Sequence, residues 1–177
     1  MNTMSRTVIL MRHARAEDAR IGMRDFDRCL TGDGRVMTHK AAAHLQALGV
    51  TFDRIIASSS ARTKETAEIM AASVGSSAPL ILWENLYNAT ADTFALAIGQ
   101  ECEDDETSVL VVGHNPGIGG LICHWAEESL FVPPATLAIF EVAAGQHWNA
   151  VRLHTQPVPK LVGLIQDGAI VRQRKAP

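Results

Sequence analysis

The sequence predicts an α/β fold: a three-layer α/β/α sandwich whose mostly parallel sheet carries an antiparallel hairpin at one edge. Short apolar runs alternate with segments of helical periodicity through most of the chain. The clearest run, Ser108–Gly113, centres on continuous apolar residues bounded by polar ones, which is typical of a strand buried on both faces. With 177 residues, 47% of them hydrophobic, the chain is long enough for one core. We therefore expect a single domain over residues 1–177, with 171–177 forming a frayed tail.

The N-terminal part of the chain supplies two strands and a helix. The apolar run Thr7–Met11 contains β-branched residues and predicts the first strand. A turn at Thr31–Gly34 predicts the start of a helix over Arg35–Leu48, and Gly49 is a plausible stop. Asp53–Ser58 predicts a second, short strand.

The middle of the chain continues the alternation. Ser60 can cap a helix that runs to about Val74. Pro79–Trp83 predicts a third strand, and Thr90 or Asp92 starts a helix through Ile98.

The C-terminal part closes the sheet. Pro116 suits the first turn of a helix that continues to Trp125. Leu137–Val142 and Trp148–Leu153 flank the turn-like segment Ala143–His147, and we expect them to pair as an antiparallel hairpin at the sheet edge.

Composition excludes several classes of function. A net charge of −3 gives no reason to expect a nucleic-acid partner. The N-terminal apolar run is too short to span a membrane and lacks the features of a signal peptide, so we expect a cytoplasmic protein with no membrane partner. The three cysteines are scattered, which predicts neither a disulfide framework nor a cysteine zinc site.

Polar side chains follow four predicted strands at the point where each strand ends. They are Arg12 and His13, Ser58 and Arg62, Glu84, and His114 and Asn115. The carboxyl ends of parallel strands share one edge of a sheet, which is where α/β proteins bind ligands. We therefore expect these side chains to lie close together.

The residue types indicate phosphoryl chemistry. The guanidinium groups of Arg12 and Arg62 match phosphate oxygens, and histidine can act as nucleophile, acid, base or donor. Helices that begin after Ser60 and Asn115 would direct their N-termini at the same anion. The chain has no glycine-rich Walker loop and no carboxylate cluster for magnesium, so we expect a site without metal or cofactor. Asn115 can contact phosphate or cap the following helix, and Ser58 can also contact phosphate.

These residues resemble the histidine phosphatase superfamily. Leu10-Met11-Arg12-His13-Ala14 is similar to its first-strand signature, with alanine where most members have glycine. Ser58–Ala67 resembles the family's Ser-Pro-x-x-Arg-x-x-x-Thr-Ala, and Cys29–Gly34 resembles its Pro-Leu-Thr-x-x-Gly. Val111–Pro116 is similar to the segment of the second histidine. The alanine variant is associated with the small SixA-like phosphohistidine phosphatases, and the resemblance implies a phosphoglycerate mutase-like fold.

The resemblance also implies roles. His13 would be the nucleophile and would form a phosphohistidine enzyme intermediate, while Arg12, Arg62 and His114 would bind the phosphoryl oxygens. Many family members protonate an alkoxide leaving group with a carboxylate. Glu84 is the candidate here, although a solvated loop carboxylate is an equally good interpretation.

Three functions follow from this reading. The first is a metal-independent phosphatase acting on protein phosphohistidine, whose imidazole leaves more easily than an alkoxide. The second is a small-molecule phosphomonoesterase of the same superfamily that uses Glu84 as its acid. The third is a non-catalytic phosphate-binding adaptor, which would have no need of a nucleophile. Larger relatives insert a lid before the second-histidine strand, where this chain has room for one helix only, and an open site favours a phosphorylated side chain of another protein.

Overall fold

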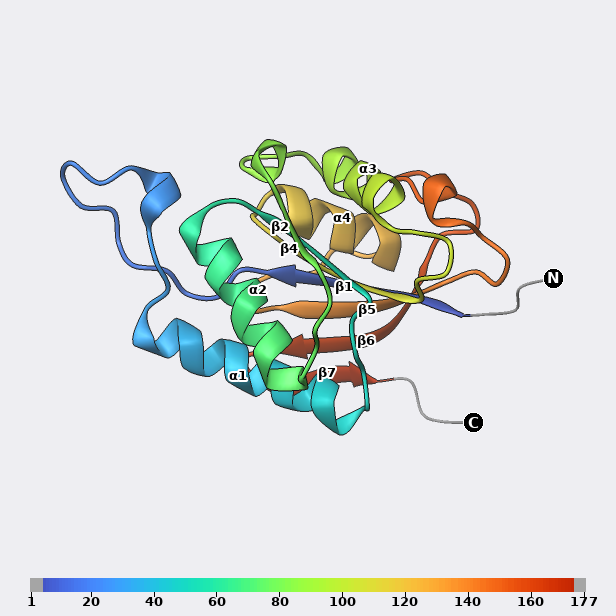
Figure 1. Cartoon of the computed structure of the whole chain (residues 1–177), viewed down its shortest axis with the longest axis horizontal. Helices are drawn as coiled ribbons and strands as arrows, with labels where there is room; N and C mark the ends of the chain where they lie inside the picture. Colours follow the sequence, from blue (N-terminus) through green and yellow to red (C-terminus); the bar gives the residue numbers. More distant parts are fainter. Residues whose placement is uncertain (1–4, 174–177) are drawn as a thin grey trace.

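A seven-stranded mixed sheet forms the middle layer of the computed structural model, which describes residues 5–173. The strand order is β3-β2-β4-β1-β5-β6-β7. The strands are β1 (Arg6–Arg12), β2 (Arg54–Ser58), β3 (Leu80–Trp83), β4 (Ser108–Gly113), β5 (Leu137–Val142), β6 (Lys160–Gln166) and β7 (Ala169–Gln173). The first four run parallel, and β5, β6 and β7 add antiparallel strands (Figure 1). This arrangement confirms the predicted α/β class.

Helices cover both faces of the sheet. They are α1 (Gly32–Ala47), α2 (Ala61–Val74), α3 (Ala91–Glu101) and α4 (Gly117–Ala126). Alternate residues of β1 enter different cores: Val8 joins the cluster under α3 and α4, whereas Ile9 joins the cluster under α1 and α2. This alternation is the period of two that a strand imposes, and it explains why a strand buried on both faces is apolar throughout.

The helix boundaries follow from local capping chemistry. Thr31 occupies the N-cap of α1, and its hydroxyl accepts a hydrogen bond from the backbone N–H of Gly34 at 3.0 Å. Gly34 also allows a close approach, because a Cβ there would lie 2.1 Å from the carbonyl oxygen of Arg15. Helix α2 ends at Gly75, which adopts the left-handed conformation with φ of 68°. The predicted helices at these two places are confirmed.

The predicted hairpin is half right. Leu137–Val142 is β5, but Trp148–Leu153 is not its partner. The chain instead forms a 3-10 turn, η3 (Trp148–Ala150). The indole of Trp148 is buried, and its N–H donates to the Glu106 carbonyl at 2.8 Å. Trp148 and Val151 are both fully buried in the core that contains α3, so the apolar spacing that suggested a strand comes from a turn that packs inward.

On the side away from β1, the partner of β5 is β6, which pairs with it antiparallel from Leu137 opposite Ile165 to Glu141 opposite Lys160. β6 in turn pairs with β7 across Asp167 and Gly168, whose φ angles are both positive, at 50° and 69°. Asp-Gly is a strong hairpin signal in a sequence.

The C-terminal tail prediction is also wrong in part. Residues 171–173 belong to β7, although every residue of this edge strand is exposed. Residues 174–177 lie outside the described range. The single-domain division stays a prediction.

The helices described between residues 5 and 173 include none with the length and hydropathy that a membrane span requires. The cytoplasmic location stays a prediction.

The burial of Trp148 can be tested by truncation. We expect Trp148→Ala to lower the free energy of unfolding by about 3–5 kcal/mol, because a large indole and its hydrogen bond are lost from the core. Urea denaturation measures this change. Phe131→Ala is the control, since Phe131 is 83% exposed and its truncation should cost less than about 0.5 kcal/mol. Equal effects of the two substitutions would contradict the buried turn.

Candidate active site

Strand β1 delivers Arg12 and His13 to the carboxyl edge of the sheet. The backbone N–H of Arg12 donates to Thr136 at 3.0 Å, and that of His13 donates to Gly113 at 3.0 Å. The His13 backbone is therefore tied to the end of β4, and that of Arg12 to the residue before β5.

A backbone carbonyl sets the tautomer of His13. Its Nδ1 lies 2.7 Å from the Ala14 carbonyl oxygen. A carbonyl oxygen only accepts, so this geometry places the proton on Nδ1 and leaves the lone pair on Nε2. His13 thus presents an unprotonated ring nitrogen to its surroundings.

Arg62 lies next to that nitrogen. It belongs to the first turn of α2, is only 6% exposed, and directs its Nε–H at His13 Nε2 over 3.3 Å. The segment that connects β2 to α2 is held by a local hydrogen bond, in which the Thr63 hydroxyl donates to the Ser58 carbonyl at 2.7 Å. Ser60 occupies the N-cap of α2 as expected, but its side chain makes no capping hydrogen bond.

His114, the residue after β4, stands beside His13 with 5.1 Å between ring centroids. The Ser58 hydroxyl is hydrogen-bonded to His114 Nε2 at 2.9 Å, and the Ser60 hydroxyl lies 3.4 Å from the same atom. Ser58 therefore orients His114.

Both histidines are electrically neutral at ordinary pH. Burial lowers the pKa of His13 to about 4, and the charges of Arg62 and Arg12 act in the same direction against the raising effect of the Ala14 hydrogen bond. Burial lowers the pKa of His114 to about 3, with the nearby His13 as the next cause. The fixed positive charge of the site is therefore carried by arginine.

Two polar atoms of this group are buried without a hydrogen-bond partner among the described residues. They are Nε of Arg12 and Nδ1 of His114. The rest of the Arg12 head is held in place, since Nη1 donates to the Val132 carbonyl at 2.8 Å. Buried groups of this kind are costly unless something pairs with them, and an oxyanion is the complementary partner of a guanidinium.

Asn115 serves the fold. Its amide nitrogen donates to the Val132 carbonyl at 3.0 Å, and its amide oxygen accepts from Gly119 N–H at 3.1 Å in the first turn of α4. Of the two roles that the sequence leaves open for Asn115, this geometry favours capping. A phosphate contact from Asn115 stays a prediction.

Glu84 follows the end of β3, whose last residue, Trp83, lies opposite Ser58 of β2. It begins the 3-10 turn η2 (Glu84–Leu86) after the edge strand β3, and its side chain is exposed. It lines a shallow surface depression with Leu82, Trp83 and Asn85. Within residues 5–173 the structure shows no hydrogen bond or ion pair from Glu84 to the histidines or arginines of the site.

Sequence reasoning missed Asp25 and Tyr87. Asp25 lies in the 3-10 turn η1 (Asp25–Asp27), and its carboxylate accepts from Arg62 Nη2 at 2.8 Å and from the Tyr87 hydroxyl at 2.6 Å. Hydrogen bonds from Tyr87, Arg28 and Arg62 hold the pKa of Asp25 well below its usual range. The signal available in the sequence was indirect: a buried arginine such as Arg62 needs a carboxylate partner.

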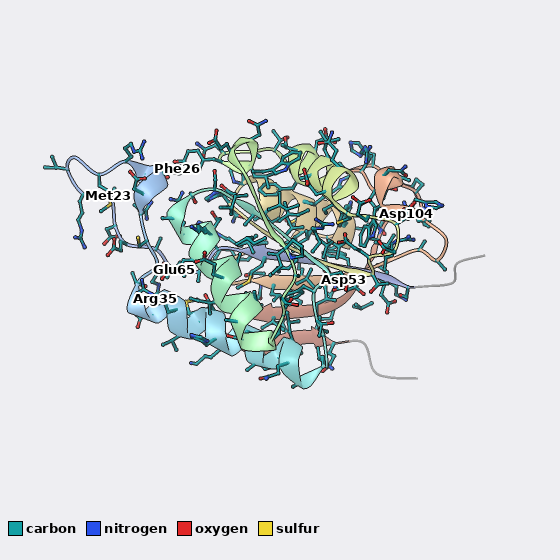
Figure 2. All side chains as sticks on the ribbon, in the orientation of Figure 1. Met23, Phe26, Arg35, Asp53, Glu65 and Asp104 are labelled. Carbon is teal, nitrogen blue, oxygen red and sulfur yellow. The ribbon has the colours of Figure 1, made fainter. Side chains whose placement is uncertain are left out.

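A second carboxylate, that of Glu65, stabilises the helix that carries Arg62. Glu65 of α2 binds Arg35 of α1 at 2.6 Å and accepts from the Leu30 backbone N–H at 2.9 Å (Figure 2). It thereby links α2 to the end of the loop that carries Asp25. The part of the chain that the structure describes contains no group of three or more His, Cys, Asp or Glu side chains arranged to hold a metal ion.

Comparison with known proteins places this chain in a family. Residues 8–97 match the profile of the histidine phosphatase superfamily, branch 1. An uncharacterised protein of Picosynechococcus sp. is 31% identical over 120 residues, which cover 68% of this chain and 70% of that protein. The chain belongs to the histidine phosphatase superfamily.

Solved structures refine the assignment. A protein of Nakamurella multipartitia that is provisionally designated phosphohistidine phosphatase SixA superposes with a TM-score of 0.75 at 27% identity, covering 92% of this chain and 96% of that one. One of Agrobacterium tumefaciens with the same provisional designation gives 0.71 at 26% identity, covering 80% and 96%. The fold is therefore that of the phosphoglycerate mutase-like histidine phosphatases, the chain is SixA-like, and the similarities support phosphatase activity.

The neutral histidines predict how stability responds to acid. Because the pKa of His13 is lowered from 6.5 to about 4 on folding, the unfolded chain binds more protons between these values. The stabilisation from the neutral His13 ring is thus fully present above pH 6.5 and is lost as pH falls toward 4. We expect chemical denaturation at a series of pH values to show this fall in the wild type and a smaller fall in His13→Gln. His39→Gln, on the exposed surface of α1, is the matched control, and a fall as small in that variant would contradict the assignment.

Proposed function

We propose that this protein is a phosphohistidine phosphatase that works through a phosphoenzyme intermediate on His13. One observation carries the proposal. The ring of His13 is neutral, its proton is held at Nδ1 by the Ala14 carbonyl, and its Nε2 lone pair faces the Nε–H of Arg62. This is the arrangement that a nitrogen nucleophile needs beside a phosphoryl group.

In the first step, Nε2 of His13 attacks phosphorus as the bond from phosphorus to the substrate's ring nitrogen breaks. The substrate ring carries a proton on its other nitrogen, so it takes the electron pair and leaves as neutral imidazole. The phosphorylated ring keeps its proton on Nδ1, where the Ala14 carbonyl oxygen accepts it at 2.7 Å and stabilises the positive ring. In the second step, water attacks phosphorus and the P–N bond electrons return to His13, which releases inorganic phosphate.

Arg12, Arg62 and His114 would stabilise the phosphoryl oxygens in both steps. The unpaired Nε of Arg12 and Nδ1 of His114 are the donor positions that suit those oxygens. Because arginine stays charged, the site needs no metal to neutralise phosphate. The proposed reaction is accordingly independent of metal and cofactor.

The surroundings of the site favour a leaving group that needs no acid. Asp25, the carboxylate that contacts Arg62, is ionised because its pKa lies well below the usual range, so it has no proton to give. Glu84 makes no hydrogen bond to the site residues of the described structure. An alkoxide requires protonation as it departs, whereas a phosphohistidine can release a neutral imidazole. These features support a phosphoramidate substrate over a phosphomonoester.

The access to the site suits a side chain presented by another protein. Between β3 and β4 the chain forms only η2 and α3, with no inserted domain to cover the strand ends. The two SixA designations at 26% and 27% identity point to the same substrate class. The partner we propose is therefore a phosphorylated protein, and neither nucleic acid nor membrane enters the reaction.

The nucleophile can be identified by trapping. We expect ³²P from a phosphohistidine protein to be recovered on His13 when single-turnover reactions are stopped in alkaline denaturant, where P–N bonds survive. His13→Ala should lose both label and turnover while its unfolding midpoint changes little, because the His13 ring lies at a strand end and not in the core. Turnover by wild type should be unchanged in EDTA.

The control is His39→Ala on the exposed surface of α1, which should keep full activity. Label on a serine, or activity that EDTA removes and magnesium restores, would contradict the mechanism.

Glu84 separates the two substrate classes. We expect Glu84→Gln to change turnover of phosphohistidine less than about threefold, because the leaving imidazole needs no general acid. Had Glu84 been the acid for a natural monoester, its loss would cost about 10²–10⁴-fold on an alkyl phosphate. Rates on phosphohistidine, an alkyl phosphate and p-nitrophenyl phosphate measure the difference. The nitrophenyl ester is the internal control, because its leaving group departs without protonation. A large loss on phosphohistidine alone would overturn the substrate assignment.

A further inference from the structure

The Arg62 guanidinium is held by a single residue at both of its terminal nitrogens. Nη1 donates to the backbone carbonyl of Asp25 at 2.5 Å, and Nη2 donates to its carboxylate at 2.8 Å. The remaining nitrogen, Nε, points to His13 Nε2 at 3.3 Å. Asp25 therefore fixes the plane of the guanidinium and determines which N–H faces the attacking nitrogen.

Asp25 is itself held in place by other donors. The Tyr87 hydroxyl donates to Oδ2 at 2.6 Å, and Arg28 Nη1 donates to Oδ1 at 2.7 Å. Arg28 is anchored in turn, because its Nε donates to the Glu17 carbonyl at 2.5 Å. A carboxylate with this many donors keeps one orientation although its side chain is 48% exposed.

Tyr87 joins this network to the second histidine. Its ring lies edge-on to His114 with 5.4 Å between centroids, and Phe26, next to Asp25, also packs edge-on to the Tyr87 ring, with 5.2 Å between centroids. The Arg62 guanidinium lies 5.8 Å from the Tyr87 centroid. The turn that carries Asp25 is thus packed against the site through an aromatic ring as well as through hydrogen bonds.

We propose that Asp25 is a positioning residue for the phosphatase reaction, which acts by orienting Arg62 so that its Nε–H faces the phosphoryl group at His13. This inference rests on the proposed function, because it takes the roles of His13 and Arg62 from there. The reaction needs a donor aimed at the developing charge in the transition state, and such a donor works best when it is oriented beforehand.

A competing explanation gives the opposite sign. In that explanation the Asp25 carboxylate occupies the phosphate-binding position on Arg62, so that removal of its negative charge would tighten anion binding. The geometry favours positioning, since Asp25 approaches from the Nη side, also uses its backbone carbonyl, and leaves the Nε side to His13. The two explanations differ in kcat and KM, so they can be separated.

The experiment compares Asp25→Asn with Asp27→Asn. The control residue lies two positions along the same turn and pairs with Arg24 at 2.6 Å on the surface. On a phosphohistidine protein and on p-nitrophenyl phosphate, we expect Asp25→Asn to lower kcat roughly ten- to a hundredfold with KM changed less than about threefold. Asp27→Asn should keep wild-type values. An unchanged kcat in Asp25→Asn would overturn the inference. If KM also fell and inorganic phosphate inhibited more tightly, the blocking explanation would take its place.

Combination with Arg62→Ala shows whether Asp25 acts through Arg62. We expect Asp25→Asn to change kcat less than about twofold once Arg62 is alanine, because the group it orients is gone. Full additivity of the two substitutions would mean that Asp25 acts elsewhere. Tyr87→Phe provides a second variant that keeps the ring and removes one donor to Asp25, and it should lower kcat in the same direction by a smaller factor.

A spectroscopic readout keeps this test independent of turnover. The ¹⁵N–¹H signal of Arg62 Nε, identified by its loss in Arg62→Ala, should be sharp in wild type and Asp27→Asn and broadened or lost in Asp25→Asn. The same sharp signal in Asp25→Asn would overturn the positioning role. Absence of turnover in wild type would contradict the proposed function alone, because the signal still reports on the orientation of Arg62.

Discussion

The register between β1 and β4 is the constraint on which the site depends. Arg12 lies opposite Gly113, so the next residues of the two parallel strands, His13 and His114, emerge side by side. A slip of one residue would turn every side chain of β1 to the other face. The apolar residues of β1 pack into both cores and hold this register. Because the register places His13 beside His114, packing in the two cores sets the distance between the two imidazole rings.

Neutral histidines and charged arginines lie side by side in the site. Burial keeps both histidines neutral, and in His13 this leaves an unprotonated lone pair on Nε2. Arginine carries the positive charge that a phosphoryl group requires, and Asp25 balances Arg62 from the side away from His13. A site built in this way keeps His13, the proposed nucleophile, uncharged beside arginine, because the cations that suit phosphate also disfavour a proton on the ring.

The elements with a clear hydrophobic pattern could be predicted from the sequence. The apolar run at Ser108–Gly113 predicted β4 to the residue, and the polar residues after it predicted the place of His114. Arg62 could be placed because it follows a strand and opens a helix. Asp25 could not, since it lies in a loop between β1 and α1 whose shape is determined by contacts distant in sequence. The segment Trp148–Leu153 misled for a related reason: Trp148 and Val151 are buried, but in and after a turn under α3, and spacing alone does not distinguish a turn from a strand over six residues.

The loop that carries Asp25 is closed at its base. Ala16 and Leu30 form a bridge, Thr31 N–H donates to the Arg15 carbonyl at 3.0 Å, and Glu17 N–H donates to Cys29 at 2.9 Å. The segment beyond this base projects from the body of the molecule (Figure 1). Closure at the base isolates β1 and α1 from changes in loop length, since lengthening a closed loop costs little free energy. Evolution could therefore remodel the outer part of the loop, and with it the surface that the proposed protein substrate would meet, without disturbing the position of His13.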